Sequence, residues 1–492
     1  MRSRSTPRLK SLALLIAACL TAGCSSDNPD ESNPVESLSG VTLHLLVVDD
    51  SALAAAIGQI RSEWEDQTDS TLQVTETSAA ELLAGKTIDA DAVIYPSALL
   101  GPLAEAKKIA RIERDWLDDE RLDWSDVFAL VRQRECRWGD DSAGHIYAVP
   151  LGSPVLVCAY RSDLLKALDM KRPQTWSEYA TLAEAFSDRS RLGKLAPPDD
   201  APWSGALEPL APGWASFVLL ARAAPYVRHR DQYSTLFDLK NMEPLIGRAC
   251  YVRALDELVA AALGSDSRSL QTTPQDARRA LLRGECGMTL TWLSAADDQT
   301  EKQSGRAISF PIDFCELPGS AEAFRFGRNK WAARRNGEDP RAPLLGISGR
   351  LGSIVATSEH PHGALRMLAW LSGRNAGGRP SSASGATTLF RRSQIRTADN
   401  WVPRDVPSST ARRYGAVVQQ TLSHSRCLFA PRMAGRAEYL AALDAAVRDA
   451  VQGRQAPADA LKQAATEWQA ITDKLGRQPQ QAAYHRSLGL EP

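Results

Sequence analysis

The alternation of apolar and polar segments along the chain indicates an α/β protein. Residues 41–48, VTLHLLVV, form an almost continuous apolar run, which is typical of a strand buried on both faces. The next segment carries Leu53, Ile57, Ile60 and Trp64 at helical spacing, so we expect a helix there. Short strands are expected next at residues 72–76 and 91–95, the second of which is stopped by Pro96.

Later segments continue the same alternation. Strands are expected at 145–152 and 155–160, on either side of the turn Gly152-Ser153-Pro154, and again at 351–356. Helices are expected at 176–186, 243–263, 361–371, 437–451 and 457–475, and Thr175 and Glu178 have the spacing of a capping box for the first of them. This order predicts mostly parallel sheets. Two stretches rich in Pro, Gly and Ser, 188–212 and 373–408, are expected to be loops.

The N-terminus has the layout of a secretory signal. Four cations within residues 2–10 precede an apolar stretch of nine residues, Leu12–Leu20, which is too short to span a bilayer. Residues 20–24, LTAGC, resemble the bacterial lipoprotein cleavage motif, in which the cysteine becomes the acylated first residue. We therefore expect a lipid anchor on Cys24; an ordinary cleaved signal is the alternative. The polar, acidic segment 24–40 is expected to be a flexible tether.

Length and charge narrow the possibilities for the mature chain. Removing residues 1–23 leaves 469 residues, more than one core usually supports, so two lobes are expected. The removed segment holds four of the 58 cations and no acid, which leaves 54 against 59 acidic residues, a net charge of −5. This mild acidity gives no electrostatic footprint for nucleic acid. The disulfide state of Cys136, Cys158, Cys250, Cys286, Cys315 and Cys427 stays open.

Motifs for catalysis, cofactors and metals are weak or missing. Residues 80–87, AELLAGKT, end like a phosphate-binding loop, but Ala80 stands where the first glycine must be. No GxSxG, HExxH or CxxC occurs, and His360 and His362 bracket the start of a predicted helix, where a capping or surface role is favoured. No cofactor or metal is therefore expected. Two carboxylates facing each other across a cleft would leave no sequence motif, so an exported hydrolase stays open.

Four segments, in order, resemble the family 1 extracellular solute-binding proteins, which serve ATP-binding-cassette (ABC) importers. They are the run GHIYAVPLGSPVLVCAYRSDLLKALDMKRPQTWSEY, the strand and aromatic of LLRGECGMTLTWLSAA, the strand-helix unit GSIVATSEHPHGALRMLAWLSG, and the terminal helix pair AALDAAVRDAVQGRQAPADALKQAATEWQAI. The resemblance spans residues 41–475 and stands behind the lipoprotein signal.

The resemblance implies a class II periplasmic-binding-protein fold, with two α/β lobes, hinge strands between them and a ligand cleft at the interface. Lobe one would comprise 41–152 plus 344–395, and lobe two 153–343 plus 396–492. The first hinge would fall at Gly152-Ser153-Pro154 and the second near Pro343.

The family's cleft positions suggest ligand-binding residues. Aromatic rings stack on the apolar face of a sugar, and carboxylates accept hydrogen bonds from its hydroxyls. Asp50 follows the first strand, where open α/β sheets bind ligands, although a helix N-cap would explain it equally well. The other candidates are Tyr95, Glu208, Trp214, Trp292 and Tyr439.

Departures from the family's maltodextrin-binding pattern also appear. The polar pair expected after Tyr95 is replaced by Ala98 and Leu99, and Leu440 stands at the position of the sugar-stacking tryptophan in the penultimate helix. Arg350 could reach the cleft, but a surface role is favoured.

The resemblance implies a monomeric, extracytoplasmic receptor, held to the membrane only by its lipid anchor, that delivers a small neutral solute to the permease subunits of an ABC importer. A carbohydrate or polyol is expected as the solute, and no catalysis. A sensory or scaffold lipoprotein with the same fold is the alternative.

Overall fold

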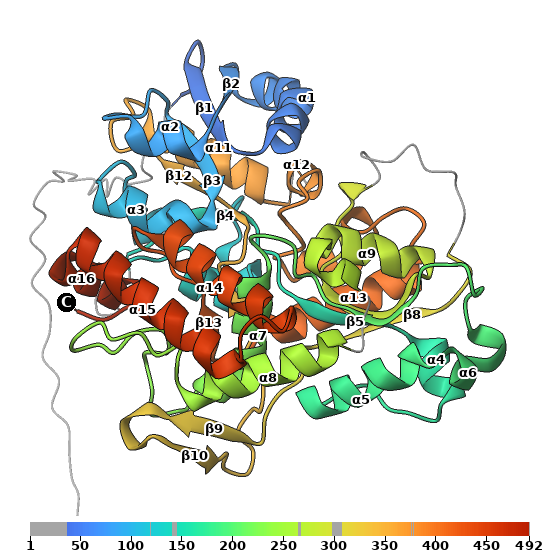
Figure 1. Cartoon of the computed structure of the whole chain (residues 1–492). Coiled ribbons are helices and arrows are strands. Elements are labelled where there is room, and N and C mark those ends of the chain that lie inside the picture. Colours follow the sequence, from blue (N-terminus) through green and yellow to red (C-terminus); the bar gives the residue numbers. More distant parts are fainter. Residues whose placement is uncertain are drawn as a thin grey trace, which may run out of the picture. The chain divides into compact units, whose positions relative to one another are not determined.

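Two mixed β-sheets, each covered by helices, organise the chain (Figure 1). The computed structural model describes residues 37–118, 120–139, 145–263, 267–297, 308–374, 376 and 378–491. The chain divides into an N-terminal unit, Met1–Ser37, and a body, Leu38–Pro492. Cys24, the signal segment and most of the expected tether lie outside the described residues. Within the described ranges, every helix is too short or too polar to cross a membrane.

The first sheet has the strand order β2-β1-β3-β12-β4. Strand β1 pairs with both of its neighbours, β2 and β3, in parallel, whereas β12 enters from far along the chain and runs antiparallel to β3 and β4. The strands are β1 (Thr42–Val48), β2 (Thr71–Thr77), β3 (Ala92–Pro96), β4 (Val149–Gly152) and β12 (Arg350–Ile354). Helices α1 (Ser51–Thr68) and α11 (Pro361–Ser372) meet at their tryptophans, Trp64 and Trp370, whose rings are 5.6 Å apart.

The second sheet has the order β6-β7-β5-β8, in which β6 and β7 are parallel and β5 is antiparallel to both neighbours. The residues of β5, β6 and β7 are all buried, which explains their apolar composition. The strands are β5 (Val157–Arg161), β6 (Ser204–Leu207), β7 (Cys286–Thr291) and β8 (Ile312–Cys315). The longer helices between them are α5 (Trp176–Ser187), α7 (Ala215–Val227), α8 (Ala249–Leu263) and α9 (Pro274–Arg283).

The C-terminal helices complete the body. Helices α14 (Arg436–Val451) and α15 (Pro457–Leu475) lie side by side, and both contact α8 (Figure 1). Helix α13 (Ser408–Thr421) packs on β8, and α16 (Arg477–Leu488) ends the described chain. Two small sheets are formed by β9 (Glu322–Arg325) with β10 (Lys330–Ala333), and by β11 (Leu344–Leu345) with β13 (Leu428–Phe429).

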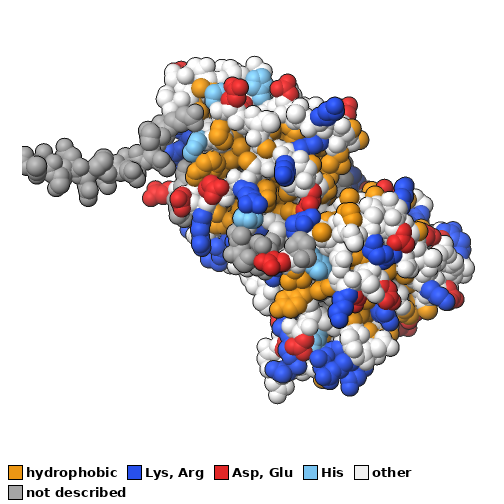
Figure 2. Space-filling view, turned by 90° about the vertical axis from the view of Figure 1, so that its left-hand side faces the viewer, with side chains coloured by type: hydrophobic (Ala, Val, Ile, Leu, Met, Phe, Trp, Pro, Cys, Tyr) orange, Lys and Arg blue, Asp and Glu red, His pale blue; other side chains and the backbone are white. Residues whose placement is uncertain are grey.

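Short helices fill the connections between these elements. They are α2 (Ala79–Ala84), α3 (Leu100–Glu105), α4 (Ser162–Ala167), α6 (Arg189–Leu192) and α12 (Arg379–Ser382). On the face of the body in Figure 2, basic and acidic side chains are interspersed, in keeping with the small net charge.

Most expected elements are confirmed, and three expectations are wrong. The sheets are mixed rather than mostly parallel, because β12 and β5 each run against their neighbours. The helix expected at 243–263 begins at Ala249, because Met242 adopts a left-handed φ of 59° in a turn that pairs Phe237 with Pro244. Neither stretch expected to be loop is only loop, since 188–212 contains α6 and the buried strand β6, and 373–408 contains α12 and a 3₁₀ helix at Ser393–Trp401.

The six cysteines of the body are buried free thiols. Cys158 and Cys315 are opposite each other in the register of β5 and β8. Burial raises the pKa of Cys136, Cys250, Cys286 and Cys427, which keeps these thiols protonated and poorly reactive.

Candidate functional site

A buried ion pair between Asp50 and Arg350 forms the centre of the candidate site. Arg350 Nε lies 2.7 Å from Asp50 Oδ2, and both side chains are less than a tenth exposed. Asp50 Oδ1 also caps α1, because it accepts from the backbone N–H of Leu53 at 3.1 Å. The remaining guanidinium contacts go to the carbonyl oxygens of Gly349 and Asp49, at 3.1 Å each. Opposite charges are thus neutralised locally where β1 ends and β12 begins.

The segment 384–386 links this ion pair to the second sheet. Ser384 Oγ donates to Asp50 Oδ2 at 2.5 Å. On its other side, the carbonyl oxygen of Gly385 accepts from Trp292 Nε1 at 3.2 Å, and that of Ser384 accepts from Ser294 Oγ at 3.3 Å. Because Trp292 and Ser294 directly follow β7, the segment contacts residues from the ends of both main sheets.

A cavity of about 540 Å³ opens beside this segment. We call it the cleft pocket; its lining residues are Asp49, Asp50, Ser51, Ala52, Glu76, Thr77, Ser78, Arg350, Ser384, Gly385 and Ala386. It lies at the carboxyl ends of β1 and β2, the edge at which open α/β sheets bind ligands. Most of the lining residues carry a hydroxyl or a carboxylate group, and the volume of the cavity falls in the range of small-molecule sites.

An aromatic pair stands on the second-sheet side of segment 384–386. The rings of Trp214 and Trp292 are 5.8 Å apart with an interplanar angle of 46°, and Phe217 lies 5.8 Å beyond Trp214. Trp292 is 3% exposed, and its carbonyl oxygen accepts a hydrogen bond from Arg278 Nη1 at 2.6 Å. Trp214 is half-buried at the start of α7. The two tryptophans predicted as ligand contacts are thus brought together, next to the lining of the cleft pocket.

Glu208, Tyr95 and Tyr439 lie elsewhere, each fully buried. Glu208 Oε1 is paired with Arg222 Nη2 at 2.5 Å inside the second-sheet half, and the guanidinium of Arg222 lies 4.2 Å from the ring of Trp176. Tyr95 is in the middle of the first sheet, where its hydroxyl hydrogen-bonds Ser353 Oγ at 2.6 Å and burial raises its pKa. These positions present neither a carboxylate nor a ring face to the cleft pocket, so they do not support the predicted ligand contacts.

Tyr439 packs between α14 and α15. Its hydroxyl bonds Thr472 Oγ1 at 2.8 Å, and its ring contacts Phe237 and Trp468. The face of α14 that meets the start of α7 is a different one. It carries Arg436, over the ring of Phe217, and Asp444, which accepts from the N–H of Ser216. Leu440 is one turn from each of them, so it, rather than Tyr439, shares the face turned toward the aromatic pair.

Three residues of the site, Arg350, Ser384 and Gly385, are not among the ligand contacts predicted from the sequence. Arg350, for which the sequence favours a surface role, is instead a buried partner of Asp50. Ser384 and Gly385 fall in the stretch 373–408, for which the sequence predicts a loop. The only sequence signal for the pairing of Arg350 with Asp50 is their position: Arg350 directly precedes one predicted strand, and Asp50 closely follows another. Among the residues that the structure describes, no three His, Cys, Asp or Glu side chains gather as a metal site.

Comparisons with known proteins identify the family. The family model of the bacterial extracellular solute-binding proteins matches residues 55–374, and the chain therefore belongs to this family. No curated protein sequence matches it.

Among solved structures, the fold resembles an ABC transporter solute-binding protein from Agrobacterium radiobacter K84 in complex with ribitol. The TM-score is 0.62 at 20% identity, covering 89% of this chain and 100% of that one. It also resembles an ABC transporter solute-binding protein from Agrobacterium vitis S4 with bound D-mannitol (TM-score 0.62, 15% identity, 89% and 99% covered). A third similar structure is the sugar-binding protein MalE from Xanthomonas citri (TM-score 0.63, 16% identity, 88% and 98% covered). The fold is thus the two-lobed one of periplasmic sugar-binding proteins.

Proposed function

We propose that this protein is a lipid-anchored, extracytoplasmic receptor that binds a small uncharged carbohydrate or polyol in the cleft pocket and delivers it to an ABC importer. It acts as a monomer and catalyses no reaction. The observation that carries the proposal is the cleft pocket itself, at the carboxyl ends of β1 and β2 and bordered by a segment that also contacts Trp292.

The buried ion pair of the pocket does not call for a charged ligand, and the carboxylates of Asp49 and Glu76, which also line it, can accept hydrogen bonds from solute hydroxyls. Asp50 and Arg350 neutralise each other, and Asp50 accepts two further hydrogen bonds, so neither side chain needs a counter-charge from the solute. Hydroxyl and backbone groups of Thr77, Ser78 and Ser384 also line the cavity. Such groups exchange hydrogen bonds with a polyhydroxylated molecule without requiring ionic partners.

We further propose that the two sheets belong to the predicted lobes, 41–152 plus 344–395 and 153–343 plus 396–492. All strands of the first sheet fall in the first set of residues and all strands of the second sheet in the other. The chain crosses between the sheets at 153–156 and again between β8 and β12. A solute that contacts both lobes would favour their closed arrangement. The hydrogen bond between Trp292 and Gly385 already joins the two proposed lobes, and such a solute would add further contacts beside it.

Three solved relatives support the ligand class. The Agrobacterium structures are described with ribitol and D-mannitol, and a Thermotoga maritima protein, MalE3, is described as maltose-bound. These are neutral, hydroxyl-rich solutes, in agreement with the chemistry of the cleft pocket.

A thermal-shift screen of the purified mature protein tests the proposal. The panel contains polyols, mono- and disaccharides, amino acids and short peptides. At 100 times its dissociation constant, a true ligand adds about 2.7 kcal/mol to the free energy of unfolding. We expect a concentration-dependent rise in melting temperature with at least one polyol or sugar. Stabilisation by amino acids or peptides alone would overturn the assignment.

A further inference from the structure

A second cavity, separate from the cleft pocket, is lined by four arginines. Its volume is about 60 Å³, and it lies beside β13 and α16. We call this cavity the guanidinium pocket. Its four arginines are Arg134, Arg228, Arg426 and Arg432. The other lining residues are Tyr233, Thr235, Leu236, Cys427, Phe429, Ala430, Pro431, Tyr484, Ser487 and Leu488. None of these is an aspartate or glutamate, and none lines the cleft pocket.

The protein leaves hydrogen-bonding capacity unused in this cavity. Arg228 donates from Nη1 to the carbonyl oxygen of Tyr233 at 3.0 Å, but its buried Nε has no acceptor. Arg432 donates to the carbonyl oxygens of Arg134, Glu135 and Ser487, and its buried Nε is likewise unmatched. The side chain of Arg134 has no hydrogen-bond or ion-pair partner among the described residues. The Nε atoms of Arg228 and Arg432 are closed off from solvent and show only that these cations are incompletely paired, whereas the unpaired guanidinium of Arg134 is the donor that an anion in the cavity would meet.

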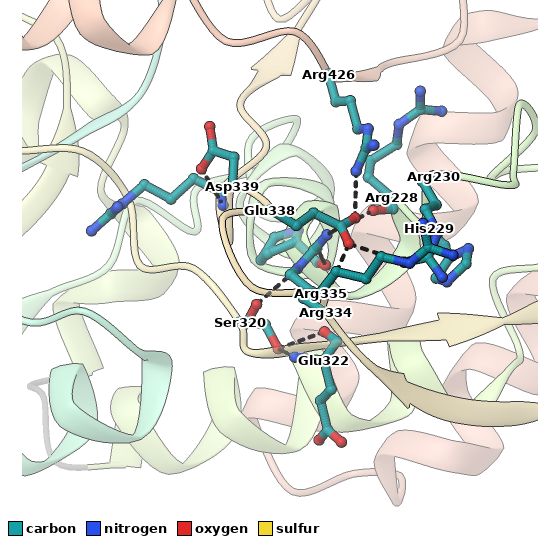
Figure 3. Close-up of polar contacts among 12 residues, drawn as sticks. Arg228, His229, Arg230, Ser320, Glu322, Arg334, Arg335, Glu338, Asp339 and Arg426 are labelled. Carbon is teal, nitrogen blue, oxygen red and sulfur yellow. Dashed lines mark hydrogen bonds and ion pairs between the residues drawn. The ribbon is translucent and has the colours of Figure 1, made fainter.

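The nearest carboxylates do not compensate this charge. Figure 3 shows Glu338 held by Arg426, Arg230 and Arg334, at 2.6 Å, 3.1 Å and 3.3 Å. Burial alone would raise the pKa of Glu338, but these contacts, led by the hydrogen bond from Arg426, lower it to about 2. Its single charge is thus shared among three guanidinium groups.

Glu135, the acid nearest Arg432, is fully buried, and burial raises its pKa to about 7. A carboxyl group that is partly protonated near neutral pH is a weak counter-ion. Burial, together with the charges of Arg134 and Arg426, also lowers the pKa of Arg228, as expected for a buried cation with other cations close by.

We infer that the guanidinium pocket binds a small oxyanion, such as phosphate, sulfate or a carboxylate. Planar guanidinium forks match the oxygen spacing of these groups and bind them by charge-assisted, often bidentate hydrogen bonds. The volume is roughly a ninth of that of the cleft pocket, so the cavity suits a small anionic group rather than a whole sugar ring. This site is independent of the proposed solute receptor function, because the two cavities share no residue.

Inorganic phosphate titrated into the mature protein by calorimetry, with chloride holding the ionic strength constant, tests the inference. We expect saturable 1:1 binding and a matching rise in melting temperature, with sulfate and acetate as arms that separate tetrahedral from planar oxyanions. Arg134→Gln and Arg228→Gln should each weaken the binding at least tenfold. Arg454→Gln removes the same charge at the exposed turn between α14 and α15, where Arg454 pairs with Asp449, and should leave phosphate binding unchanged.

Three results would overturn the inference: a wild-type protein that responds equally to phosphate and chloride, phosphate binding that survives Arg134→Gln, and a loss of binding that is the same in Arg454→Gln. Because Arg134 is half-exposed and has no partner to lose, this variant decides the question even if Arg228→Gln does not fold. Polyol or sugar binding, measured on the same variants, should not change, so a failure here leaves the solute proposal untouched.

Discussion

Asp50 serves the fold and the cleft pocket with the same carboxylate. One oxygen caps α1 and the other accepts from Arg350 and Ser384. A buried ion pair adds little stability as a whole, but removing one member leaves an uncompensated charge that costs about 3–5 kcal/mol. Even a conservative substitution of Asp50 or Arg350 would therefore lower the stability of the fold and the affinity for a ligand together. A substitution in the aromatic pair, Trp214 and Trp292, allows the two effects to be measured separately.

Trp292→Phe should weaken ligand binding while the protein stays folded. The change keeps an aromatic ring but removes the N–H that bonds the carbonyl oxygen of Gly385. This bond joins the two proposed lobes, and we expect it to form in the closed arrangement that the solute favours. Its loss, about 1 kcal/mol, should then weaken binding of the solute that the screen identifies roughly fivefold, measured by titration calorimetry.

Trp468→Phe is the matched control for this variant. Trp468 Nε1 donates to the carbonyl oxygen of Tyr439 at 2.6 Å, in the packing between α14 and α15. Trp468→Phe should lower the free energy of unfolding in urea by about 1 kcal/mol and leave the affinity unchanged, whereas Trp292→Phe should lower the affinity. Equal affinity in both would remove Trp292 from the site.

The sequence could predict site residues whose position depends on the strand that they follow. It could not predict contacts between residues that lie far apart in the sequence and that only the fold brings together. Asp50 and Trp292 each follow a strand directly, so their place at a sheet edge is readable from the local pattern. Arg350 and Ser384 reach Asp50 from about 300 residues away, which no local pattern encodes. Tyr95 also ends a strand, but its hydroxyl lies against Ser353 of the adjacent β12 and its ring is buried, which depends on the neighbouring strand.

At the scale of elements, the boundaries of a helix could be predicted where a residue such as proline marks its first turn. The boundaries of a short strand with a weak hydrophobic pattern could not. Helix α15 runs over residues 457–475 as expected, because Pro457 marks its first turn. Strand β6 has only four residues, Ser204–Leu207, and two of them are Ser and Gly. Its burial is decided by pairing with β7, and Gly205 is required there because a Cβ would lie 2.1 Å from the carbonyl oxygen of Ala183.

His424 ties three elements together and should make stability depend on pH. It follows α13 and contacts Glu316, after β8, through Nε2, and Asp339, after β10, through Nδ1. Burial alone would lower the pKa of His424, but the hydrogen bonds to both carboxylates raise it to about 9. The folded pKa thus exceeds the ordinary value of about 6.5, so this stabilisation is complete below pH ~6.5 and is lost as pH rises toward 9.

His424→Gln should therefore lower the free energy of unfolding at pH 6 by up to about 3 kcal/mol, at ~1.4 kcal/mol per pKa unit, and by much less at pH 9.5. Urea unfolding at both pH values measures this. His360→Gln is the control, because His360 makes no capping hydrogen bond at the start of α11. A deficit of the same size at pH 6 and pH 9.5 would contradict the assignment.

At the scale of the whole molecule, each main sheet contains one strand that runs against its neighbours. In the first sheet this is β12, which arrives about 200 residues after β4, and in the second it is β5, the first strand after the crossing at 153–156. This arrangement follows from a chain that crosses between the two halves more than once. The family resemblance implied the two lobes, whereas the strand directions could not be read from the local alternation of helices and strands.

The expected anchor also belongs to this scale. If Cys24 is acylated, Cys24→Ser should move the protein from the membrane fraction to the soluble fraction of cells, because the rest of the chain would lack its lipid. Immunoblotting of fractionated cells measures the distribution. An unchanged membrane fraction for the Cys24→Ser variant would rule out the anchor.

The central claim is that an uncharged, hydroxyl-rich solute binds in the cleft pocket. Hydrogen–deuterium exchange of the mature protein, with and without the polyol or sugar that stabilises it most, tests this claim most directly. We predict slower exchange in peptides covering residues 49–54, 76–79 and 384–387, with little change in α16. Unchanged exchange in 384–387, with protection confined to other parts of the body, would contradict it.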